Sequence, residues 1–339
     1  MPEEAVVGRE YRLVQVGLGA LGRRLTPFLL ERSQLRLVGA VEVDPKVAGR
    51  DLGEVAGLEK RLGVTVQGEL GAALAGGDVE AAVVTTVSGL KQAEPQIAAL
   101  LEHKVNIVSS CEELSYPWET APEVSARIDR LAKAAGVSVL GTGVNPGFLM
   151  DLLPIALTAI VREVKKITVL RYQDARFRRL PFQQKIGAGL TMEQFERKRA
   201  AGTLRHVGLT ESMHMVASRM GWKLERTEDL ISPVIAEHEV GGAEITVKPG
   251  MARGVQQIGS GFVGGEEKIR LKFRACLGEE DVQDTVIIEG EPDIRFTIPG
   301  GVNGDVATCA ILTNAIPAVI EAAPGLRTMA DIPAVSWFG

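Results

Sequence analysis

A glycine-rich turn near the start of the chain has the spacing that phosphate binding requires. The apolar stretch at residues 12–16 leads directly into Gly17-Leu18-Gly19-Ala20-Leu21-Gly22. Gly17 permits a tight turn, Gly19 lets a pyrophosphate approach the main chain, and Gly22 permits close packing of the next helix on the sheet. Because the N–H groups at a helix start attract anions, residues 17–22 are predicted to bind a dinucleotide.

An acid that would contact the adenosine ribose follows the second predicted strand. Glu42 lies 20 positions after Gly22, which is about the separation expected for such an acid. Asp44 is the other candidate. Glu42 favours NAD because it would repel a 2′-phosphate, whereas Arg23 and Arg24 could accept one. NAD and NADP therefore both stay open as the cofactor.

Two adjacent carboxylates, Glu112 and Glu113, follow a predicted core strand at residues 105–110. Adjacent side chains on an extended segment point in opposite directions, so one glutamate can face a cofactor while the other faces solvent or caps a helix. A carboxylate beside a nicotinamide ring could hold a substrate ammonium group and transfer protons. Burial would raise its pKa and ease that transfer near neutral pH. The alternative is that both glutamates are solvated loop residues.

Other candidate residues lie in loops that follow predicted strands, where ligands of such sheets bind. Thr86 and Ser88 could bond the nicotinamide ribose or cap a helix. Asn145 belongs to an Asn-Pro-Gly turn, and Phe148 could form an apolar wall of a substrate pocket or lie in the core. Arg176, in the basic run at residues 176–179, could bind a substrate carboxylate or a cofactor phosphate, or lie on a solvated edge. We expect the cofactor to contact, besides the glycine-rich turn, Arg23, Glu42, Asp44, Thr86, Ser88, Cys111 and Asn303.

Strands and helices alternate in the first part of the chain. Apolar runs predict strands at residues 12–16, 36–43, 64–67, 79–86, 105–110 and 137–140. Helical periodicity is found between them at residues 23–32, 69–75, 92–102 and 119–135. This order predicts an α/β fold, a doubly wound parallel sheet of the Rossmann type, over residues 1–147.

The pattern changes after residue 147. Helices are predicted at residues 148–161, 192–200 and 206–221, and strands at residues 165–175, 234–240, 245–247, 268–275, 282–289 and 294–298. We expect an α+β domain over residues 148–302 with a mostly antiparallel sheet, which binds substrate. An apolar helix at residues 304–322 is predicted to return to the first domain, so residues 303–339 are grouped with it.

Composition limits the possible partners and location. The chain has 339 residues and a net charge of -5, which provides no general field for nucleic acid. The first ten residues are polar and contain no apolar signal core, and no uncharged apolar run reaches the roughly 18 residues of a membrane helix. The three cysteines and four histidines do not occur at metal-ligand spacing. We therefore expect a cytoplasmic protein without a metal site.

Several distinctive motifs lie along the chain, at residues 17–22, 43–53, 111–117, 141–148, 184–189, 304–308 and 314–317. By these motifs together the chain resembles the 2,4-diaminopentanoate dehydrogenases and the related native amine dehydrogenases, whose first domain is like that of dihydrodipicolinate reductase.

The resemblance implies NAD(P)-dependent oxidative deamination of a small-molecule amine, and in reverse the reductive amination of a ketone by ammonia. It also implies a homodimer formed through the second domain. The family's catalytic glutamate maps onto Glu112, with Glu113 as the alternative, and the aromatic residue of the pocket maps onto Phe148. Glu42 stands where aspartate is more often expected, so the preference between NAD and NADP stays open.

Other interpretations remain. The substrate could be a diamino acid whose carboxylate is bound by Arg176, Arg178 or Arg179, or a simple amine that needs only an apolar pocket. An ammonia-independent carbonyl reductase on the same scaffold is a second enzyme class. A third possibility is that the protein is not an enzyme and only binds a dinucleotide as a sensor.

Overall fold

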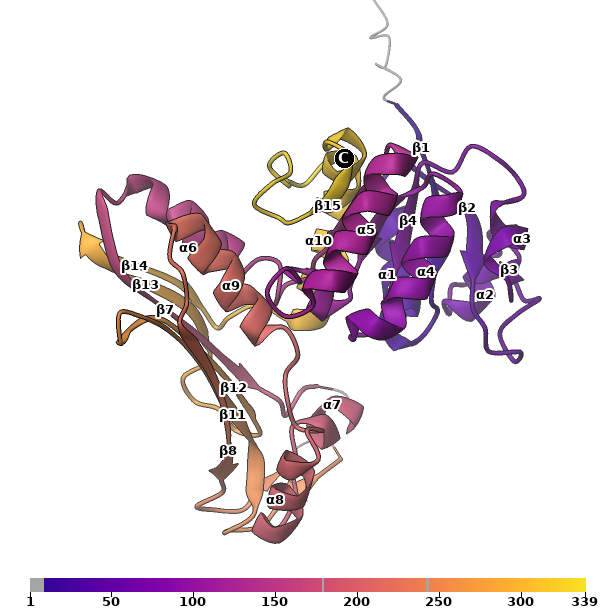
Figure 1. Cartoon of the computed structure of the whole chain (residues 1–339). Helices are drawn as coiled ribbons and strands as arrows, with labels where there is room; N and C mark the ends of the chain where they lie inside the picture. The colour runs from indigo at the N-terminus through magenta and orange to yellow at the C-terminus, as the bar shows by residue number, and fades with distance from the viewer. Residues whose placement is uncertain (1–8, 179, 242–243) are drawn as a thin grey trace, which may run out of the picture. The chain divides into compact units, whose positions relative to one another are not determined.

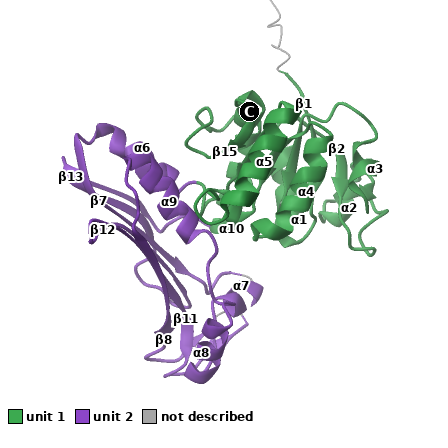
Figure 2. Cartoon of the chain, in the orientation of Figure 1, with its two compact units in different colours: residues 1–147, 304–339 green, residues 148–303 purple. Residues whose placement is uncertain are grey.

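The computed structural model describes residues 9–178, 180–241 and 244–339. The chain forms two compact units, shown in Figure 2. Unit 1 comprises residues 1–147 and 304–339, and unit 2 comprises residues 148–303. The predicted roles of the two units, dinucleotide binding for unit 1 and substrate binding for unit 2, stay predictions.

Unit 1 contains a sheet of seven strands in the order β15-β6-β5-β4-β1-β2-β3, and every neighbouring pair is parallel (Figure 1). The winding reverses between β1 and β4, and ligands of doubly wound sheets bind at the carboxyl ends of the strands beside such a reversal. The predicted Rossmann sheet is confirmed. The strands are β1 (Tyr11–Val16), β2 (Leu35–Val41), β3 (Val66–Gln67), β4 (Ala81–Val84), β5 (Asn106–Ser109), β6 (Ser138–Gly141) and β15 (Gly325–Arg327).

Helices cover both faces of this sheet. On one face α1 (Ala20–Leu30) packs with α10 (Gly304–Glu321), and on the other α4 (Leu90–Glu102) packs with α5 (Pro122–Ala135). Strands between two helical layers must be apolar on both sides, and all four residues of β4 are buried. Short helices occur in the connections, namely α2 (Leu52–Val55), α3 (Leu70–Leu74) and η1 (Glu112–Leu114).

The side chain of Asp51 organises the connection between β2 and β3. Its buried carboxylate accepts hydrogen bonds from the N–H groups of Gly53 at 2.9 Å, Leu62 at 2.9 Å and Gly63 at 2.8 Å. These bonds, that of Leu62 above all, hold the pKa of the carboxyl below its usual range. Asp51 belongs to the motif at residues 43–53, and its contacts here close a loop.

Unit 2 contains a sheet of six strands in the order β14-β13-β7-β12-β11-β8. Four neighbouring pairs are antiparallel and the β7–β12 pair is parallel, so the predicted mostly antiparallel sheet is confirmed. The strands are β7 (Glu163–Asp174), β8 (Arg226–Ile235), β11 (Ala252–Val263), β12 (Glu266–Cys276), β13 (Gln283–Glu291) and β14 (Ile294–Pro299), and a small separate sheet pairs β9 (Val240–Gly241) with β10 (Thr246–Val247).

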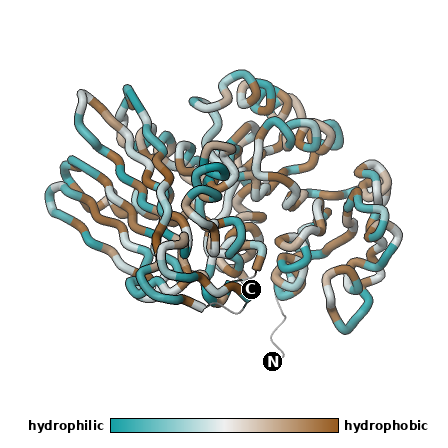
Figure 3. Tube along the Cα trace, turned by 90° about the horizontal axis from the view of Figure 1, so that it is seen from below, coloured by the Kyte–Doolittle hydropathy of each residue, from teal (hydrophilic) through white to brown (hydrophobic). Residues whose placement is uncertain are grey.

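The helices of unit 2 pack on one face of its large sheet (Figure 1). Buried and more exposed residues alternate along the strands: on β12, Ile269 and Leu271 are buried, whereas Arg270 is exposed. Figure 3 shows the matching alternation of hydropathy. Such a period of two is expected where only one face of a sheet is packed. The helical segments are α6 (Leu152–Leu157), η2 (Thr158–Ile160), α7 (Leu180–Lys185), α8 (Met192–Ala200) and α9 (Leu209–Met220).

Several boundaries in unit 2 differ from the prediction. The helix expected over residues 148–161 begins only at Leu152, whose N–H is accepted by the Asp151 carboxylate at 2.7 Å. The helix expected from residue 206 begins at Leu209, because Gly208 before it has a φ of 102°. The strand expected over residues 234–240 is wrong, since β8 ends at Ile235 and β9 starts only at Val240.

The strand β11 was not predicted because glycines interrupt its apolar pattern. A Cβ atom at Gly254 would lie 2.1 Å from the carbonyl oxygen of Ala275, and one at Gly259 would lie 3.2 Å from side-chain atoms of Leu209 and Met213. These glycines therefore permit close approach of β12 and α9 to the strand. Among the described residues, no helix combines the length and apolar character that crossing a bilayer demands.

A buried ion pair holds the segment that leads out of unit 2. Arg171 on β7 and Asp284 on β13 are 2% and 4% exposed, and their Nη1 and Oδ1 atoms are 3.0 Å apart. Asp284 Oδ2 accepts the N–H of Val302 at 2.8 Å, and Arg171 Nη2 donates to the Val302 carbonyl oxygen at 3.5 Å. The pair therefore fixes the main chain directly before Asn303 and α10.

We expect Asp284→Asn to lower the free energy of unfolding by about 3–5 kcal/mol, because it leaves the Arg171 charge buried without its partner. The double variant Arg171→Met, Asp284→Leu should recover most of this loss. Urea unfolding measures both. Glu54→Gln, which removes the exposed pair with Arg50, is the control and should cost less than about 1 kcal/mol. A loss below about 1 kcal/mol for Asp284→Asn would contradict the assignment.

Candidate dinucleotide and catalytic site

The three glycines of the first turn have different environments. Gly17 has a φ of 91°, and a Cβ there would lie 2.8 Å from the Thr85 carbonyl oxygen. A Cβ at Gly22 would lie 2.0 Å from the Gly17 carbonyl oxygen. A Cβ at Gly19, in contrast, would meet nothing within 4 Å. The packing of the chain therefore requires glycine at 17 and 22, whereas Gly19 leaves an open approach of the kind that a pyrophosphate uses.

The start of α1 is open to an anion. Gly19 is the N-cap and provides no side-chain cap, and no acidic residue lies in the first turn, which begins with Ala20 and Leu21. The helix has 11 residues, so its N-terminal N–H groups carry a partial positive charge. Arg23 is exposed, and its Nε atom donates to the Leu18 carbonyl oxygen at 2.8 Å.

The structure separates the two acids after β2. Glu42 Oε2 accepts the N–H of Leu18 at 2.7 Å, so this carboxylate lies against the glycine-rich turn. Its Oε1 atom accepts the N–H of Asp44 at 3.2 Å. The Asp44 carboxylate is exposed and accepts the N–H of Lys46 at 2.9 Å, which is a local turn contact. Glu42 is therefore the acid that the fold holds beside the turn.

The loop after β4 contains both predicted and unpredicted residues. Thr86 is exposed and donates to Gln96 Oε1 at 2.7 Å. The preceding Thr85, which was not predicted, is buried and donates to the Gly17 carbonyl oxygen at 2.9 Å. A polar residue that ends an entirely apolar strand was the available signal for it. Ser88 is partly buried, and its carbonyl oxygen accepts the Cys111 thiol at 3.2 Å.

The thiol of Cys111 is 1% exposed. Burial raises its pKa to about 12, so it stays protonated at neutral pH. Its hydrogen bond to the loop after β4 gives it a structural role, and its predicted contact with a cofactor stays a prediction.

The two adjacent glutamates in η1 have different surroundings. Glu113 Oε2 accepts the N–H of Leu90 at 2.7 Å, so its carboxylate caps the N-terminus of α4. Glu112 is partly buried, and its carbonyl oxygen accepts the hydroxyl of the buried Ser115 at 2.8 Å. Strand β5, which leads into η1, is next to β4 in the sheet. Both residues therefore lie at the carboxyl edge that contains the glycine-rich turn.

The loop after β6 is formed by close main-chain contacts. Gly147 has a φ of 123°, and a Cβ there would lie 2.5 Å from the N atom of Gly143. The N–H of Val144 bonds the hydroxyl of Thr308 on α10 at 3.3 Å. Asn145 is buried in this loop, and Phe148, the first residue of unit 2, is partly buried. Their roles toward a substrate stay predictions.

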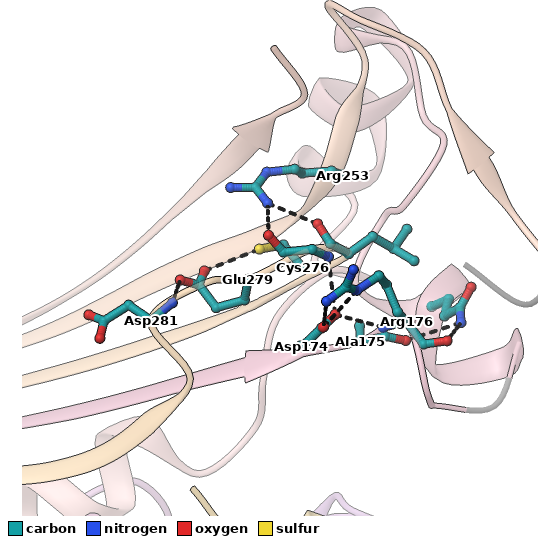
Figure 4. A network of polar contacts seen from close by, with 10 residues as sticks. Asp174, Ala175, Arg176, Arg253, Cys276, Glu279 and Asp281 are labelled. Atoms are coloured by element: carbon teal, nitrogen blue, oxygen red, sulfur yellow. Dashed lines mark hydrogen bonds and ion pairs between the residues drawn. The ribbon is translucent and has the colours of Figure 1, made fainter. Parts of the chain in front are cut away.

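Arg176 belongs to a polar network of unit 2 (Figure 4). Its Nη2 atom is 2.6 Å from Asp174 Oδ2, and Asp174 Oδ1 accepts the N–H of Gly278 at 3.0 Å. The hydrogen bond with Asp174 raises the pKa of the Arg176 guanidinium. A substrate carboxylate would have to compete with Asp174 for this group. Arg178 stacks over Phe182, 4.0 Å from the ring centre, and Arg179 lies outside the described residues.

Asn303 is exposed and follows the segment that Arg171 and Asp284 hold. The main chain directly before Asn303 is therefore held in place, and the contact of Asn303 with the cofactor stays a prediction. Within residues 9–178, 180–241 and 244–339, no three His, Cys, Asp or Glu side chains lie close enough to bind a metal ion together.

A doubly wound sheet, a glycine-rich turn with an open phosphate approach and a second unit on a separate sheet define the class of two-unit dinucleotide-dependent oxidoreductases. Sequence comparison identifies the family. The sequence model of the 2,4-diaminopentanoate dehydrogenase C-terminal domain matches residues 148–338. The chain belongs to the 2,4-diaminopentanoate dehydrogenase family, which confirms the resemblance.

Three relatives illustrate the match. The 2,4-diaminopentanoate dehydrogenase of Acetoanaerobium sticklandii is 33% identical over 95% of this chain and 93% of its own length. The amine dehydrogenase of Streptomyces virginiae is 23% identical over 94% of each chain. The solved structure of the amine dehydrogenase from Mycobacterium smegmatis has a TM-score of 0.84 and 26% identity, and the alignment covers 97% of each chain.

Two glycine variants test the phosphate approach. Gly19→Ala places its Cβ in open space, so the melting temperature should stay near that of wild type while the Kd for NADH rises about tenfold or more, which is about 1.4 kcal/mol. Gly22→Ala should lower the melting temperature because its Cβ would overlap the Gly17 carbonyl oxygen. Fluorescence titration and thermal unfolding measure the two effects. Wild-type NADH affinity in Gly19→Ala would exclude this turn as the pyrophosphate site.

Proposed function

We propose that this protein is an NAD(P)-dependent amine dehydrogenase that interconverts an amine with a ketone and ammonia. One observation carries the proposal. Glu113 caps α4 by accepting the N–H of Leu90, and Glu112, onto which the family's catalytic glutamate maps, lies at the carboxyl edge of the sheet that contains the glycine-rich turn. Membership of the 2,4-diaminopentanoate dehydrogenase family supports the same reaction class.

Glu112 would bind the substrate ammonium group and move its protons. A bound nicotinamide cofactor supplies the hydride chemistry, as acceptor in deamination and as donor in the reverse reaction. In deamination, Glu112 takes a proton from the ammonium group and releases it to solvent, and the amine carbon loses its hydride to give an iminium ion. Water then adds to that carbon while Glu112 takes a proton from the water, which gives a carbinolamine. Glu112 returns this proton to the nitrogen, and ammonia leaves as the hydroxyl group gives up its own proton to Glu112. The products are a ketone and ammonia.

The residues around the turn support binding of NAD or NADP, with a preference for NAD. Gly17 to Gly22 and the start of α1 would hold the pyrophosphate. The Glu42 carboxylate beside Leu18 would accept the ribose hydroxyls and repel a 2′-phosphate. The sequence suggests that Arg23 could bind the 2′-phosphate of NADP. Its Nε atom already donates to the Leu18 carbonyl oxygen, which weakens this argument for NADP. Thr86, Ser88, Cys111 and Asn303 remain the proposed contacts to the rest of the cofactor.

For the substrate we propose a small amine or ketone bounded by Phe148 and Asn145. A diamino acid is the second candidate, and the 33% identity to a 2,4-diaminopentanoate dehydrogenase favours it. Its carboxylate would need a cation from unit 2. Arg176 and Arg178 are the described candidates, and at Arg176 the substrate carboxylate would have to compete with Asp174.

We also propose a homodimer formed through unit 2, and a cytoplasmic location. The support for the dimer is the sheet face opposite the helices, which carries a row of residues across neighbouring strands. Leu230, 62% exposed, pairs with Ile258, which pairs with Lys272, which pairs with Leu170. Leu230 is exposed, the other three residues are partly buried, and three of the four are apolar. Accessible apolar side chains in such a row are typical of a surface that is covered by a partner.

The dimer proposal predicts that Leu230→Asp combined with Ile258→Asp yields a monomer in sedimentation equilibrium, because two charges on that face oppose burial of the apolar row. Ile160→Asp is the matched control, since Ile160 is 69% exposed but lies in η2, and it should leave the mass unchanged. A wild-type protein that sediments as a monomer would remove the proposal.

The first functional measurement is the oxidation of NADH and of NADPH with a panel of small ketones, with and without high ammonium. We expect ammonium-dependent oxidation, faster with NADH, and at least a thousandfold lower kcat for Glu112→Gln with an unchanged Kd for NADH. Cyclohexylamine and 2,4-diaminopentanoate in the deamination direction separate the two substrate classes.

Three outcomes of this assay would contradict the proposal. Oxidation that ignores ammonium would indicate a carbonyl reductase. Cofactor binding without turnover on any amine or ketone would indicate a sensor. Wild-type activity of Glu112→Gln would remove Glu112 from the mechanism.

A further inference from the structure

We propose that Glu113 and Gly141 are positioning residues that fix the main chain of Glu112 at the carboxyl edge of the sheet. The inference rests on the proposed function, because it concerns the residue assigned to proton transfer. Neither residue needs to touch substrate or cofactor for this role.

The first contact joins the start of η1 to the loop after β4. The carbonyl oxygen of Ser88 accepts the thiol of Cys111 at 3.2 Å and the N–H of Glu113 at 3.3 Å. The residues on both sides of Glu112 are therefore bonded to one acceptor. This arrangement restricts rotation of the peptide units that carry the Glu112 side chain.

The second contact is made by the Glu113 side chain. Its Oε2 atom accepts the N–H of Leu90, the first residue of α4, at 2.7 Å. Gly89, the N-cap of that helix, provides no side-chain cap, so Glu113 satisfies a helix donor that would otherwise lack a cap. The partial positive charge of the helix end stabilises the carboxylate there. The Glu113 carboxylate is therefore placed at the start of α4, and proton transfer is the role proposed for Glu112.

The third contact is made by the main chain of β6. A Cβ atom at Gly141 would lie 2.5 Å from the carbonyl carbon of Leu114 and 2.7 Å from the N atom of Ser115. The last residue of β6 therefore packs directly on the main chain of η1. Ser115, which is 0% exposed, in turn donates to the Glu112 carbonyl oxygen at 2.8 Å. Any side chain at 141 would displace the turn that carries Glu112.

These contacts come from three separate parts of the sheet edge, namely the loop after β4, the start of α4 and the end of β6, and they converge on residues 111–115. A displacement of about 1 Å at a reacting group can cost on the order of a hundredfold in rate. Residues that do not contact the reactants can therefore affect the rate, because they keep the main chain of the proton-transfer residue in position.

Variants at Glu113 test the proposal through rescue by a conservative change. Glu113→Gln keeps an oxygen that can accept the N–H of Leu90, so kcat should fall by no more than about threefold. Glu113→Ala removes the acceptor, and kcat should fall about 10- to 100-fold with little change in KM for the cofactor. A thousandfold loss in Glu113→Gln would overturn the proposal, because Glu113 would then take part in the chemistry. Wild-type kcat in Glu113→Ala would overturn it as well.

Gly141→Ala provides an independent test. It should lower kcat about 10- to 100-fold while the Kd for NADH stays within about twofold of wild type. Gly71→Ala is the matched control, because a Cβ at Gly71 meets nothing within 4 Å, and its kcat should match wild type. Thermal unfolding is recorded for each variant, and kcat is compared well below the melting temperature. Wild-type kcat in Gly141→Ala would overturn the role of Gly141.

Glu112→Gln, assayed in parallel, separates the two levels of inference. If Glu112→Gln is inactive and the Glu113 variants behave as expected, both the function and the positioning role stand. If Glu112→Gln retains wild-type activity, the proposed function fails, whatever the Glu113 variants do. If Glu112→Gln is inactive but Glu113→Ala matches wild type, only the positioning role fails.

Discussion

Direct packing of main chain on main chain at the carboxyl edge of the parallel sheet is the constraint on which the rest of unit 1 depends. The turn after β1 contacts the main chain of Thr85 and the start of α1, and the end of β6 contacts η1 in the same way. Such contacts exclude even a single methyl group, so glycine is required wherever two segments meet. Gly19 is different, because a Cβ atom there would meet nothing within 4 Å. Packing within the chain does not explain this glycine, whereas the approach of a ligand to the main chain would.

The electrostatics of the edge follow from the same arrangement. Two carboxylates are fixed by backbone donors, Glu42 by the N–H groups of Leu18 and Asp44 and Glu113 by that of Leu90. A hydrogen bond from a backbone N–H to a carboxylate is charge-assisted, so it fixes the position of the side chain. One negative charge is thus placed beside the expected ribose position and another at the start of α4. The fold therefore assigns different roles to acids that look equivalent in the sequence.

The sequence allowed unit 1 to be predicted well because its strands are short apolar runs separated by turn residues, and because parallel order follows from the alternation with helices. Unit 2 was predicted less completely. Strand β11 has glycines at positions where β12 and α9 approach, so its pattern depends on contacts far apart in the chain. Strand β15 has only three residues, which is too short for periodicity to reveal. At the site, the glycine-rich turn was found from spacing, whereas Thr85 was missed because its partner, the Gly17 carbonyl oxygen, lies on another strand end.

The adjacent glutamates define the limit of what one sequence can decide. Alternation along an extended segment predicts that their side chains diverge, but it does not say which of them faces the reactants. That choice depends on the start of α4, which lies more than twenty residues earlier in the chain and donates its first N–H to Glu113. A helix N-terminus competes for whichever carboxylate can reach it, and here η1 brings Glu113 within 2.7 Å. The proposed assignment of proton transfer to Glu112 therefore depends on tertiary structure, because the contact that makes Glu113 a helix cap joins residues far apart in the chain.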